Sequence, residues 1–320
     1  MKKLWLMLFL LLVPVSVEAA SSYAVVDAQT GRLLMGASED ARLPIASLTK
    51  MWTALIAIEN GNLDDVVTVS KRATLSEGSS IYLEEGQEIK LEHLLYGLML
   101  RSGNDAATAI AEHVGGSVDG FVKLMNDKAE LYGLNGTVFT NPSGLHHEEH
   151  LSTAEDTAKM LQIAMKNETF RKIATTVLYK GKVVAWQNKH KLLSQDVGAI
   201  AGKTGYTKVA GRTLATYFQR GDKEFVVVTI NESNDWEVHR GIADRIDNEY
   251  ENYELVEAGD YLIPKATITL NKPITLLLTK EERENIQHTL IARRDYQRAV
   301  WQVALEGDVI FSKAVSIQED

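Results

Sequence analysis

The hydrophobic pattern of the chain is densest between Ser47 and Asn60, where nearly every residue up to Ile58 is apolar. A run of this kind surrounds a helix axis on most sides, so it predicts a buried helix. Asn60-Gly61 is a typical C-terminal stop for such a helix. Two polar side chains, Ser47 and Lys50, lie at its N-terminal end. Because residues three apart share one helix face, we expect these two side chains to lie within reach of each other.

Outside this helix the period of the pattern changes twice. Residues 23–35 are typical of a β-hairpin, and residues 66–69 of another short strand. From residue 91 to about residue 165 the period is helical, with a capping box at residues 152–155 that begins a helix. Strand patterns then return, which predicts an α/β (α+β) domain with one sheet built from both ends and a helical block inserted between them. The later strands are expected at residues 183–186, 213–217 and 225–230.

The C-terminal part of the chain has only short β-like runs. Residues 266–270 alternate between apolar and polar side chains, and residues 274–278 are an apolar run. Two further short strands are expected at residues 309–311 and 315–317. We therefore predict a small β-rich domain at residues 259–320, after a larger catalytic domain at residues 20–258.

The first nineteen residues have the pattern of a secretory signal. Lys2 and Lys3 precede an uncharged apolar run at residues 4–13, and Ala19 is a small residue suited to cleavage. The alternative is a membrane anchor, but the run is short for a bilayer span. We expect residues 1–19 to be a cleaved signal peptide and the mature protein to act outside the cytoplasm.

Composition narrows the classes of function. The chain has 320 residues, of which 45% are hydrophobic and 24% charged, as in ordinary globular proteins. Its formal net charge is −9 and no basic patch stands out, so nucleic acid is not an expected partner. It contains no cysteine, which excludes both disulfide bonds and thiol catalysis.

Ser47 and Lys50 indicate a nucleophile and its base. Burying a lysine beside a hydroxyl costs free energy, so a function is expected for it. A lysine whose pKa is depressed by burial can take the serine proton and leave an alkoxide-like nucleophile. The Ser-x-x-Lys pattern alone occurs about once by chance in a chain of this composition. Its other interpretation is an N-capping serine followed by a surface lysine.

Two more short motifs favour the catalytic interpretation. Ser102-Gly103-Asn104 lies between two helical runs, and Lys203-Thr204-Gly205 follows the apolar run at residues 199–202. Taken singly, these motifs are also typical of a capping loop and of a strand-end turn. The Lys-Thr-Gly motif, however, is expected only about 0.1 times by chance. All three motifs in this order make coincidence a minor explanation.

With these motifs the sequence resembles the serine penicillin-recognising enzymes. It is most similar to the low-molecular-mass D-alanyl-D-alanine carboxypeptidases of the peptidase S11 family, over about residues 22–258. The resemblance implies a β-lactamase/DD-peptidase-like domain, with an antiparallel sheet flanked by helices and an inserted helical subdomain, followed by a shortened β-sandwich domain. Many members end in an amphipathic membrane-anchoring helix, and we expect none before Asp320. The segments that carry the resemblance are residues 45–50, 95–106, 141–145 and 202–207.

The resemblance also implies acyl transfer in two steps without a metal or cofactor. Ser47 would attack the carbonyl of the penultimate D-alanine of a peptidoglycan stem peptide, with Lys50 as the base. Ser102 would pass a proton to the departing nitrogen, and Asn104 would hold Lys50 and the substrate amide. β-Lactam antibiotics would acylate the same serine and act as covalent inhibitors.

The third motif is expected to bind the substrate. Lys203 would supply a positive field, Thr204 would bind the substrate carboxylate, and Gly205 would line the site. The backbone N–H groups of Ser47 and Tyr206 would form the oxyanion hole. A carboxypeptidase must also recognise a terminal carboxylate, which calls for a further cationic donor.

An arginine after the strand at residues 225–230 is the expected donor. Arg240 is the candidate by its position within the resemblance, and a surface helix arginine is the alternative.

Two other functions stay open at this point. A β-lactamase of the same fold needs a separate group to activate the deacylating water, and Glu168 lies in the relevant interval, although its surroundings do not resemble the usual loop. A catalytically silent wall protein would bind penicillin or peptidoglycan without releasing D-alanine.

The segment from His146 to His150 contains His-x-x-Glu-His, a metalloprotease signature when it lies on a helix. Here it follows residues 142–144 and precedes the helix cap predicted at residue 152, so we expect a loop and no metal site.

Overall fold

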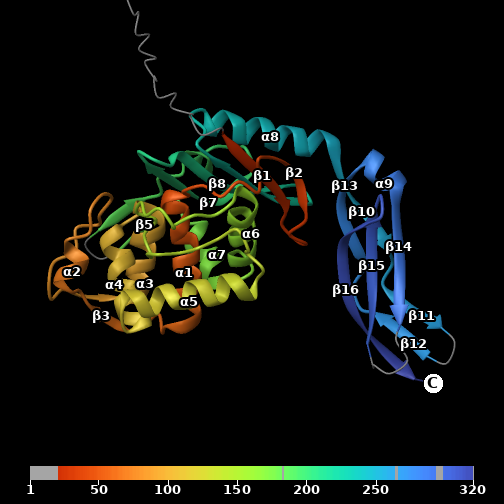
Figure 1. The fold of residues 1–320 in the computed structure, drawn as a ribbon, viewed down its shortest axis with the longest axis horizontal. Coiled ribbons are helices and arrows are strands. Elements are labelled where there is room, and N and C mark those ends of the chain that lie inside the picture. The colour runs from red at the N-terminus through yellow and green to blue at the C-terminus, as the bar shows by residue number, and fades with distance from the viewer. Residues whose placement is uncertain (1–20, 182–183, 264–265, 293–297, 320) are drawn as a thin grey trace, which may run out of the picture.

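The computed structural model describes residues 21–181, 184–263, 266–292 and 298–319, which form a larger lobe and a smaller C-terminal lobe (Figure 1). The larger lobe holds a sheet and a block of helices. The long helix α8 (Asp235–Glu249) lies along the sheet and leads into the smaller lobe. Within the described ranges, no helix is long and apolar enough to cross a membrane.

The sheet of the larger lobe has five antiparallel strands. Two strands from the beginning of the chain pair with three strands that follow the helical block, which confirms the predicted assembly from both ends. In spatial order the strands are β2 (Leu33–Ala37), β1 (Ser22–Asp27), β9 (Lys223–Ile230), β8 (Gly211–Arg220) and β7 (Ala199–Thr207).

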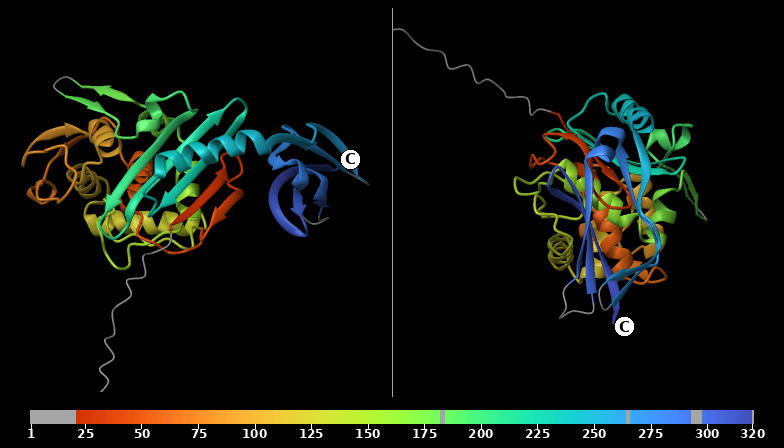
Figure 2. Two further views of the ribbon diagram at one scale, coloured as in Figure 1. Left: turned by 90° about the horizontal axis from the view of Figure 1, so that it is seen from above. Right: turned by 90° about the vertical axis from the view of Figure 1, so that its right-hand side faces the viewer.

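Both faces of this sheet are covered. Val226 and Val228 of β9 pack into the helical block, whereas Phe225 and Val227 pack on the side of α8. Successive strand residues point to opposite faces, so a continuous apolar run such as β9 supplies both layers. Seen from above, α8 crosses the face of the sheet opposite the helical block (Figure 2). Strand β7 is at the edge of the sheet, where the Lys-Thr-Gly motif lies.

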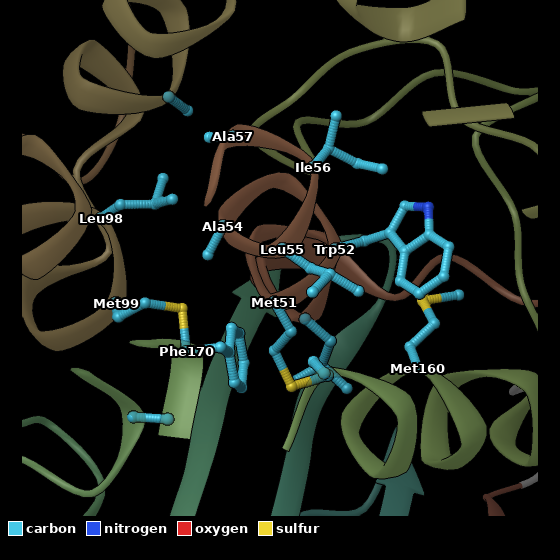
Figure 3. Packing of buried hydrophobic residues seen from close by; sticks show 14 of the residues in the cluster. Met51, Trp52, Ala54, Leu55, Ile56, Ala57, Leu98, Met99, Met160 and Phe170 are labelled. Atoms are coloured by element: carbon cyan, nitrogen blue, oxygen red, sulfur yellow. The ribbon is translucent and has the colours of Figure 1, made fainter. Parts of the chain in front are cut away.

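The helical block is organised around α1. Met51, Trp52, Leu55 and Ile56 project from several sides of this helix, and each is at most 1% exposed. Figure 3 shows Met160 pointing toward the Trp52 ring. Burying one such side chain contributes about 1.5–3 kcal/mol to the stability of the fold. The helices are α1 (Thr49–Asn60), α2 (Lys71–Thr74), α3 (Leu91–Tyr96), α4 (Asn104–Gly115), α5 (Val118–Leu131), α6 (Ala154–Ala164) and α7 (Glu168–Ala174).

Short elements connect these helices. Strand β6 overlaps the strand expected at residues 183–186, of which residue 183 lies outside the described residues. The short elements are η1 (Ala46–Leu48), η2 (Gly97–Arg101), η3 (Lys191–Ser194), β3 (Val66–Thr68), β4 (Glu88–Lys90), β5 (Leu178–Lys180) and β6 (Ala185–Gln187).

Helix α6 begins one residue later than the predicted capping box implies. Its cap is Thr153, whose side chain accepts a hydrogen bond from the N–H of Asp156. The backbone of Ser152 is instead paired with Leu43 in an isolated β-bridge. An extended, paired Ser152 is not available as the helix cap, so the box predicted at residues 152–155 is wrong.

The C-terminal lobe is built of strands. Strand β10 pairs with β13, and the remaining strands form a five-stranded antiparallel sheet in the order β11-β12-β16-β15-β14. The two strands expected at 309–311 and 315–317 are parts of one strand, β16. The elements are β10 (Tyr250–Val256), β11 (Gly259–Ile263), β12 (Ala266–Leu270), β13 (Ile274–Thr279), α9 (Lys280–Asn285), β14 (Ile286–Ala292), β15 (Arg298–Leu305) and β16 (Asp308–Glu319).

One arginine joins the two lobes. Arg32 precedes β2, and its guanidinium donates to Glu282 Oε1 at 2.7 Å and to the carbonyl oxygen of Leu277 at 2.6 Å. Both charged side chains are largely buried, so this ion pair is better shielded from solvent than an ordinary surface pair.

Candidate active site

Ser47 lies in η1, at the point where the chain turns into α1. The preceding residue, Ala46, has a positive φ of 48°, which is unfavourable for a residue with a Cβ. Ser102 has a φ of 65°. Strained backbone of this kind is found preferentially at functional sites, because the surrounding structure must hold it in place.

Lys50 is completely buried on the first turn of α1. Its Nζ lies 2.9 Å from Ser47 Oγ and donates to the carbonyl oxygen of Ser143 at 2.5 Å. Burial lowers the pKa of Lys50 well below its usual value, and the positive charges of Lys203 and Lys189 lower it further. The predicted pairing of Ser47 with a buried, pKa-depressed lysine is therefore present in the structure.

The segment at residues 141–145 packs against this pair. Asn141 Oδ1 accepts hydrogen bonds from the N–H groups of Ser143 and Gly144, which fixes a tight turn. Gly144 has a φ of 80°, and a Cβ there would lie 1.8 Å from the carbonyl oxygen of Ala46. Only glycine fits both the conformation and this close approach. The turn directs the Ser143 carbonyl toward Lys50.

Ser102 follows the π-helical turn η2 and is almost fully buried. Its Oγ accepts a hydrogen bond from Lys203 Nζ at 3.1 Å, so the second and third motifs are in direct contact. Asp105, in the first turn of α4, is also buried, and its carboxylate accepts hydrogen bonds from the N–H groups of Ile81 and Leu83. This carboxylate fixes the loop beside the Ser-x-Asn motif.

Asn104 is placed differently from the expectation. Its Nδ2 donates to the carbonyl oxygen of Glu77, and the hydrogen bonds of the described residues include none between its side chain and Lys50. The lysine is held by Ser143 instead. In this conformation Asn104 anchors the loop at residues 77–79.

Lys203 is buried on the edge strand β7, with 2% of its surface exposed. Its Nζ also donates to the carbonyl oxygen of Thr204 at 2.7 Å. Burial and, to a smaller extent, the positive charge of Lys189 together lower the pKa of Lys203 to about 7. The strand lies very close to the nucleophile, because a Cβ at Gly205 would be 3.0 Å from the backbone nitrogen of Ser47.

These elements surround a cleft of about 510 Å³. Lys50 and Lys203 reach two of its lining serines from the protein interior. The motif residues that line the cleft are Ser47, Ser102, Thr204, Gly205 and Tyr206. Other lining residues that the sequence motifs do not include are Ser79, Lys189, Lys191, Arg212, Thr213, Asp235 and Trp236.

Arg240 does not line this cleft. It lies on α8, where its guanidinium contacts Glu237 and donates to Gln195 Oε1 at 2.8 Å. It lines a separate surface hollow together with Asp244 and Asp247. Position along the chain alone could not show which face of α8 carries Arg240, because successive helix residues point about 100° apart.

The histidine-rich segment is a loop, as expected. His150 is buried, and its Nδ1 accepts from the N–H of Thr140 at 3.1 Å, so Nε2 carries the proton and donates to Thr49 Oγ1 at 2.8 Å. Burial lowers the pKa of His150 to about 4. His146 and His147 are exposed. In the described part of the chain, no three His, Asp or Glu side chains are grouped as metal ligands.

Several contacts in the cleft were not anticipated. Ser143 belongs to the segment at residues 141–145, whose likeness to the family was a usable signal. Lys189 and Arg212 lie outside the segments that resemble the family, so no pattern in the sequence indicated them. Only the pairing of β7 with β8, which sets Tyr206 opposite Arg212, brings that arginine to the cleft.

Comparison with known proteins agrees with this geometry. Residues 13–234 match the family Peptidase_S11, D-alanyl-D-alanine carboxypeptidase. The chain is 30% identical to the D-alanyl-D-alanine carboxypeptidase DacF of Bacillus subtilis, over 94% of this chain and 85% of that protein. It is 33% identical to DacB2 of Mycobacterium tuberculosis, over 67% of this chain and 76% of that protein.

Solved structures share the fold. The D-alanyl-D-alanine carboxypeptidase DacD of Francisella tularensis superposes with a TM-score of 0.74 at 22% identity, over 98% of each chain. Penicillin-binding protein 5 of Haemophilus influenzae does so with a TM-score of 0.77 at 22% identity, over 93% of this chain and 96% of that chain. The family match covers most of the chain, and the chain belongs to the D-alanyl-D-alanine carboxypeptidases of the peptidase S11 family.

Proposed function

We propose that this protein removes the terminal D-alanine from peptidoglycan stem pentapeptides through a Ser47 acyl-enzyme. The observation that carries the proposal is the 2.9 Å contact between Ser47 Oγ and the completely buried Nζ of Lys50. A serine hydroxyl is a weak nucleophile until a base takes its proton. Membership of the S11 family supplies the class of substrate.

Lys50 is the proposed base in acylation. Because burial and two neighbouring lysines lower its pKa, the neutral amine of Lys50 forms more readily than that of an ordinary lysine. That neutral amine takes the Ser47 proton as Oγ attacks the carbonyl carbon of the penultimate D-alanine. The N–H groups of Ser47 and Tyr206 are the proposed oxyanion hole, which is supported by the close approach of β7 to Ser47.

Ser102 is the proposed proton relay to the departing D-alanine nitrogen. Its bond to Lys203 Nζ supports this role, since a cation beside the hydroxyl favours release of its proton. Thr204 is proposed to bind the substrate carboxylate, and Asn104 the substrate amide. The C–N bond breaks as the nitrogen is protonated, and water then cleaves the Ser47 ester to restore the serine.

The two alternatives gain no support. Glu168 is exposed at the start of α7 and does not line the cleft, so nothing places it as the deacylating base of a β-lactamase. A silent binding protein would not need a buried, pKa-depressed lysine in contact with its serine. Penicillin is expected to acylate Ser47 and to inhibit the enzyme.

The site of action follows from the same proposal. Peptidoglycan lies outside the cytoplasmic membrane, so we propose that residues 1–19 direct export and that the enzyme acts on the wall. The division into catalytic residues 20–258 and C-terminal residues 259–320 also stays a proposal. The pairing of β10 with β13 supports moving the boundary to about Tyr250.

Mass spectrometry tests the proposed function directly. Incubation with a pentapeptide that ends in D-Ala-D-Ala should remove one alanine from it, and a labelled penicillin should attach to the peptide that contains Ser47. Ser47→Ala should abolish both signals while the circular dichroism spectrum is kept. An unchanged pentapeptide would overturn the proposed function, and an adduct on another serine would overturn the role of Ser47.

A further inference from the structure

The proposed reaction needs a group that recognises the free carboxylate next to the scissile bond. Arg212 is the arginine that lines the catalytic cleft, together with Ser47 and Thr204. It lies on β8 directly opposite Tyr206 of β7. An arginine at this place is close to the strand that carries the Lys-Thr-Gly motif, whereas Arg240 belongs to a different hollow.

Two residues of the first turn of α8 hold the Arg212 guanidinium. Its Nη2 donates to Asp235 Oδ1 at 2.6 Å, and the Asp235 side chain is only 3% exposed. The guanidinium carbon also lies 5.8 Å from the centre of the Trp236 ring. A guanidinium fixed by an ion pair and an aromatic face loses less conformational entropy when it binds a ligand.

Arg212 keeps unused donors. A guanidinium has five N–H groups, and the described residues give it one hydrogen bond, to Asp235. Its Nε is buried without a hydrogen-bond partner among the described residues, although buried polar atoms are normally paired. Its side chain is nevertheless 42% exposed, so other atoms of the group are accessible from the cleft.

The surroundings favour an anion. Lys189 and Lys191 also line the cleft, and Lys203 lies just behind it. Asp235 is the acidic residue among the lining residues, and Arg212 already pairs with it. A carboxylate at this end of the cleft would therefore meet several cations and unused N–H donors in a bidentate arrangement.

We propose that Arg212, held in place by Asp235 and Trp236, binds the terminal carboxylate of the substrate together with Thr204. This inference rests on the proposed carboxypeptidase function and names the residue that makes the enzyme specific for a free C-terminus. The same contact would hold the carboxylate of a penicillin.

The experiment compares two substrates, a D-Ala-D-Ala pentapeptide with a free terminal carboxylate and the same peptide with a C-terminal amide. For Arg212→Gln, kcat/KM for the acid should fall about ten- to a hundredfold, while kcat/KM for the amide should change little. Arg212→Lys keeps the charge without the fork and should give an intermediate loss. Arg240→Gln is the matched control and should leave both values unchanged.

Loss of Arg212 would leave the buried Asp235 carboxylate without its partner, so folding needs its own control. The double variant Arg212→Gln/Asp235→Asn removes the pair together and should show the same loss of acid-over-amide preference. An unchanged preference in both variants would overturn the inference, as would equal losses on both substrates, which would indicate a structural role. A parent enzyme that releases no D-alanine would overturn the proposed function itself.

Discussion

The two lobes treat polar side chains in opposite ways. The larger lobe, which carries the cleft, buries Lys50, Lys203 and Asp105, whereas the described residues from Tyr250 onward have no polar or charged side chain in their buried core. The C-terminal core consists of aliphatic residues and Trp301. Among the described residues, fully buried charged side chains thus occur only in the lobe that carries the cleft, whereas Glu282 of the C-terminal lobe is partly buried in its ion pair with Arg32. Ionisable groups in such surroundings cluster at functional sites.

The difference shows which lobe is destabilised by buried ionisable groups. Taking an ionisable group out of water costs free energy even when it is hydrogen-bonded, and replacing such a group by an apolar one often stabilises a protein. The large apolar cluster around α1 offsets this cost in the larger lobe. The described core of the C-terminal lobe contains no fully buried charged side chain, so this cost is smaller there. Substitutions in the two lobes should therefore separate activity from stability.

The largest expected effect is that of Lys50→Met on acylation. The variant keeps the side-chain volume but removes the base, so acylation of Ser47 should fall about 10²- to 10⁴-fold. Labelled penicillin and rapid quenching measure this rate. Lys166→Met, which changes an exposed lysine, is the matched control and should acylate normally. Near-normal acylation in Lys50→Met would assign the base to another group.

The same variant should change how stability depends on pH. The pKa of Lys50 is lowered in the folded state, so the unfolded chain binds more protons between that lowered pKa and about 10.5. Stability should therefore rise with pH in this window, by about 1.4 kcal/mol per pH unit for this group. Urea titrations between pH 7.5 and 9.5 should show that Lys50→Met loses this increment of slope, while Lys166→Met keeps it.

The next expected effect is a loss of stability of the larger lobe as the pH falls. Burial lowers the pKa of His150 to about 4, that of His190 to about 3 and that of His239 well below its usual value. The unfolded chain binds protons at these groups below about pH 6.5, so stability is lost as pH falls from 6.5 toward 4, by up to about 1.4 kcal/mol per pH unit for each histidine.

Urea unfolding between pH 7 and pH 4.5 measures this loss. Lys166→Met changes an exposed side chain away from these three histidines and should leave the pH dependence in this range unchanged. Constant stability across this range would show that the three buried histidines do not titrate differently on unfolding.

The sequence predicted the contact at the centre of the proposed site. Ser47 and Lys50 are brought together by helix geometry over three residues, which a sequence pattern can reveal. The contact of Ser102 with Lys203 joins residues about a hundred positions apart. The family resemblance placed both residues in one site but did not predict this contact. A sheet built from both ends of the lobe was also predictable, because apolar runs there must be buried together. The strand expected at residues 183–186 is an exception, since β6 pairs with β5 outside this sheet.

The direction of single side chains was not predictable. Arg240 and Arg212 both flank the strand at residues 223–230, and strand register and helix rotation decide which of them faces the cleft. Asn104 likewise belongs to the right motif but contacts Glu77. In the C-terminal lobe the boundary near Tyr250 depends on the pairing of β10 with β13, a contact between segments whose sequences give no sign of each other.

A further expected effect is on stability alone. Leu278 is fully buried in the C-terminal core, so Leu278→Ala should lower the free energy of unfolding by about 2–5 kcal/mol through lost burial and a cavity. The rate of D-alanine release, measured well below the melting temperature of the variant, should stay unchanged. Leu262→Ala is the matched control, because Leu262 is 82% exposed in the same lobe. A parallel loss of activity would show that the lobes are energetically coupled, for example through Arg32.

A smaller effect is expected from Lys189. Its positive charge lowers the pKa of both Lys50 and Lys203, and its Nζ donates to Ser79 Oγ at 3.2 Å. Lys189→Gln should raise the pKa of Lys50, so less neutral base is present at pH 7 and the acid limb of the acylation profile should move to higher pH. We expect a rate loss of about tenfold, for a change of one pKa unit.

Lys191→Gln is the control, since Lys191 lines the cleft but is not among the causes of either pKa shift. Equal pH profiles for the two variants would contradict a specific role for Lys189.

The smallest effect should come from the two exposed histidines of the loop at residues 146–150. Both ring nitrogens of His150 are engaged by Thr49 and Thr140, so this histidine is not available as a metal ligand without losing those bonds. His146 and His147 alone are too few ligands for a zinc site. The double variant His146→Gln/His147→Gln, and separately a metal chelator, should therefore change D-alanine release by less than about twofold, as for ordinary surface changes.

His150→Gln is the informative counterpart. It should lower the melting temperature because its hydrogen bonds are lost, and added zinc should not raise the melting temperature again. Activity that disappears with the chelator and returns with zinc would contradict this interpretation of the loop.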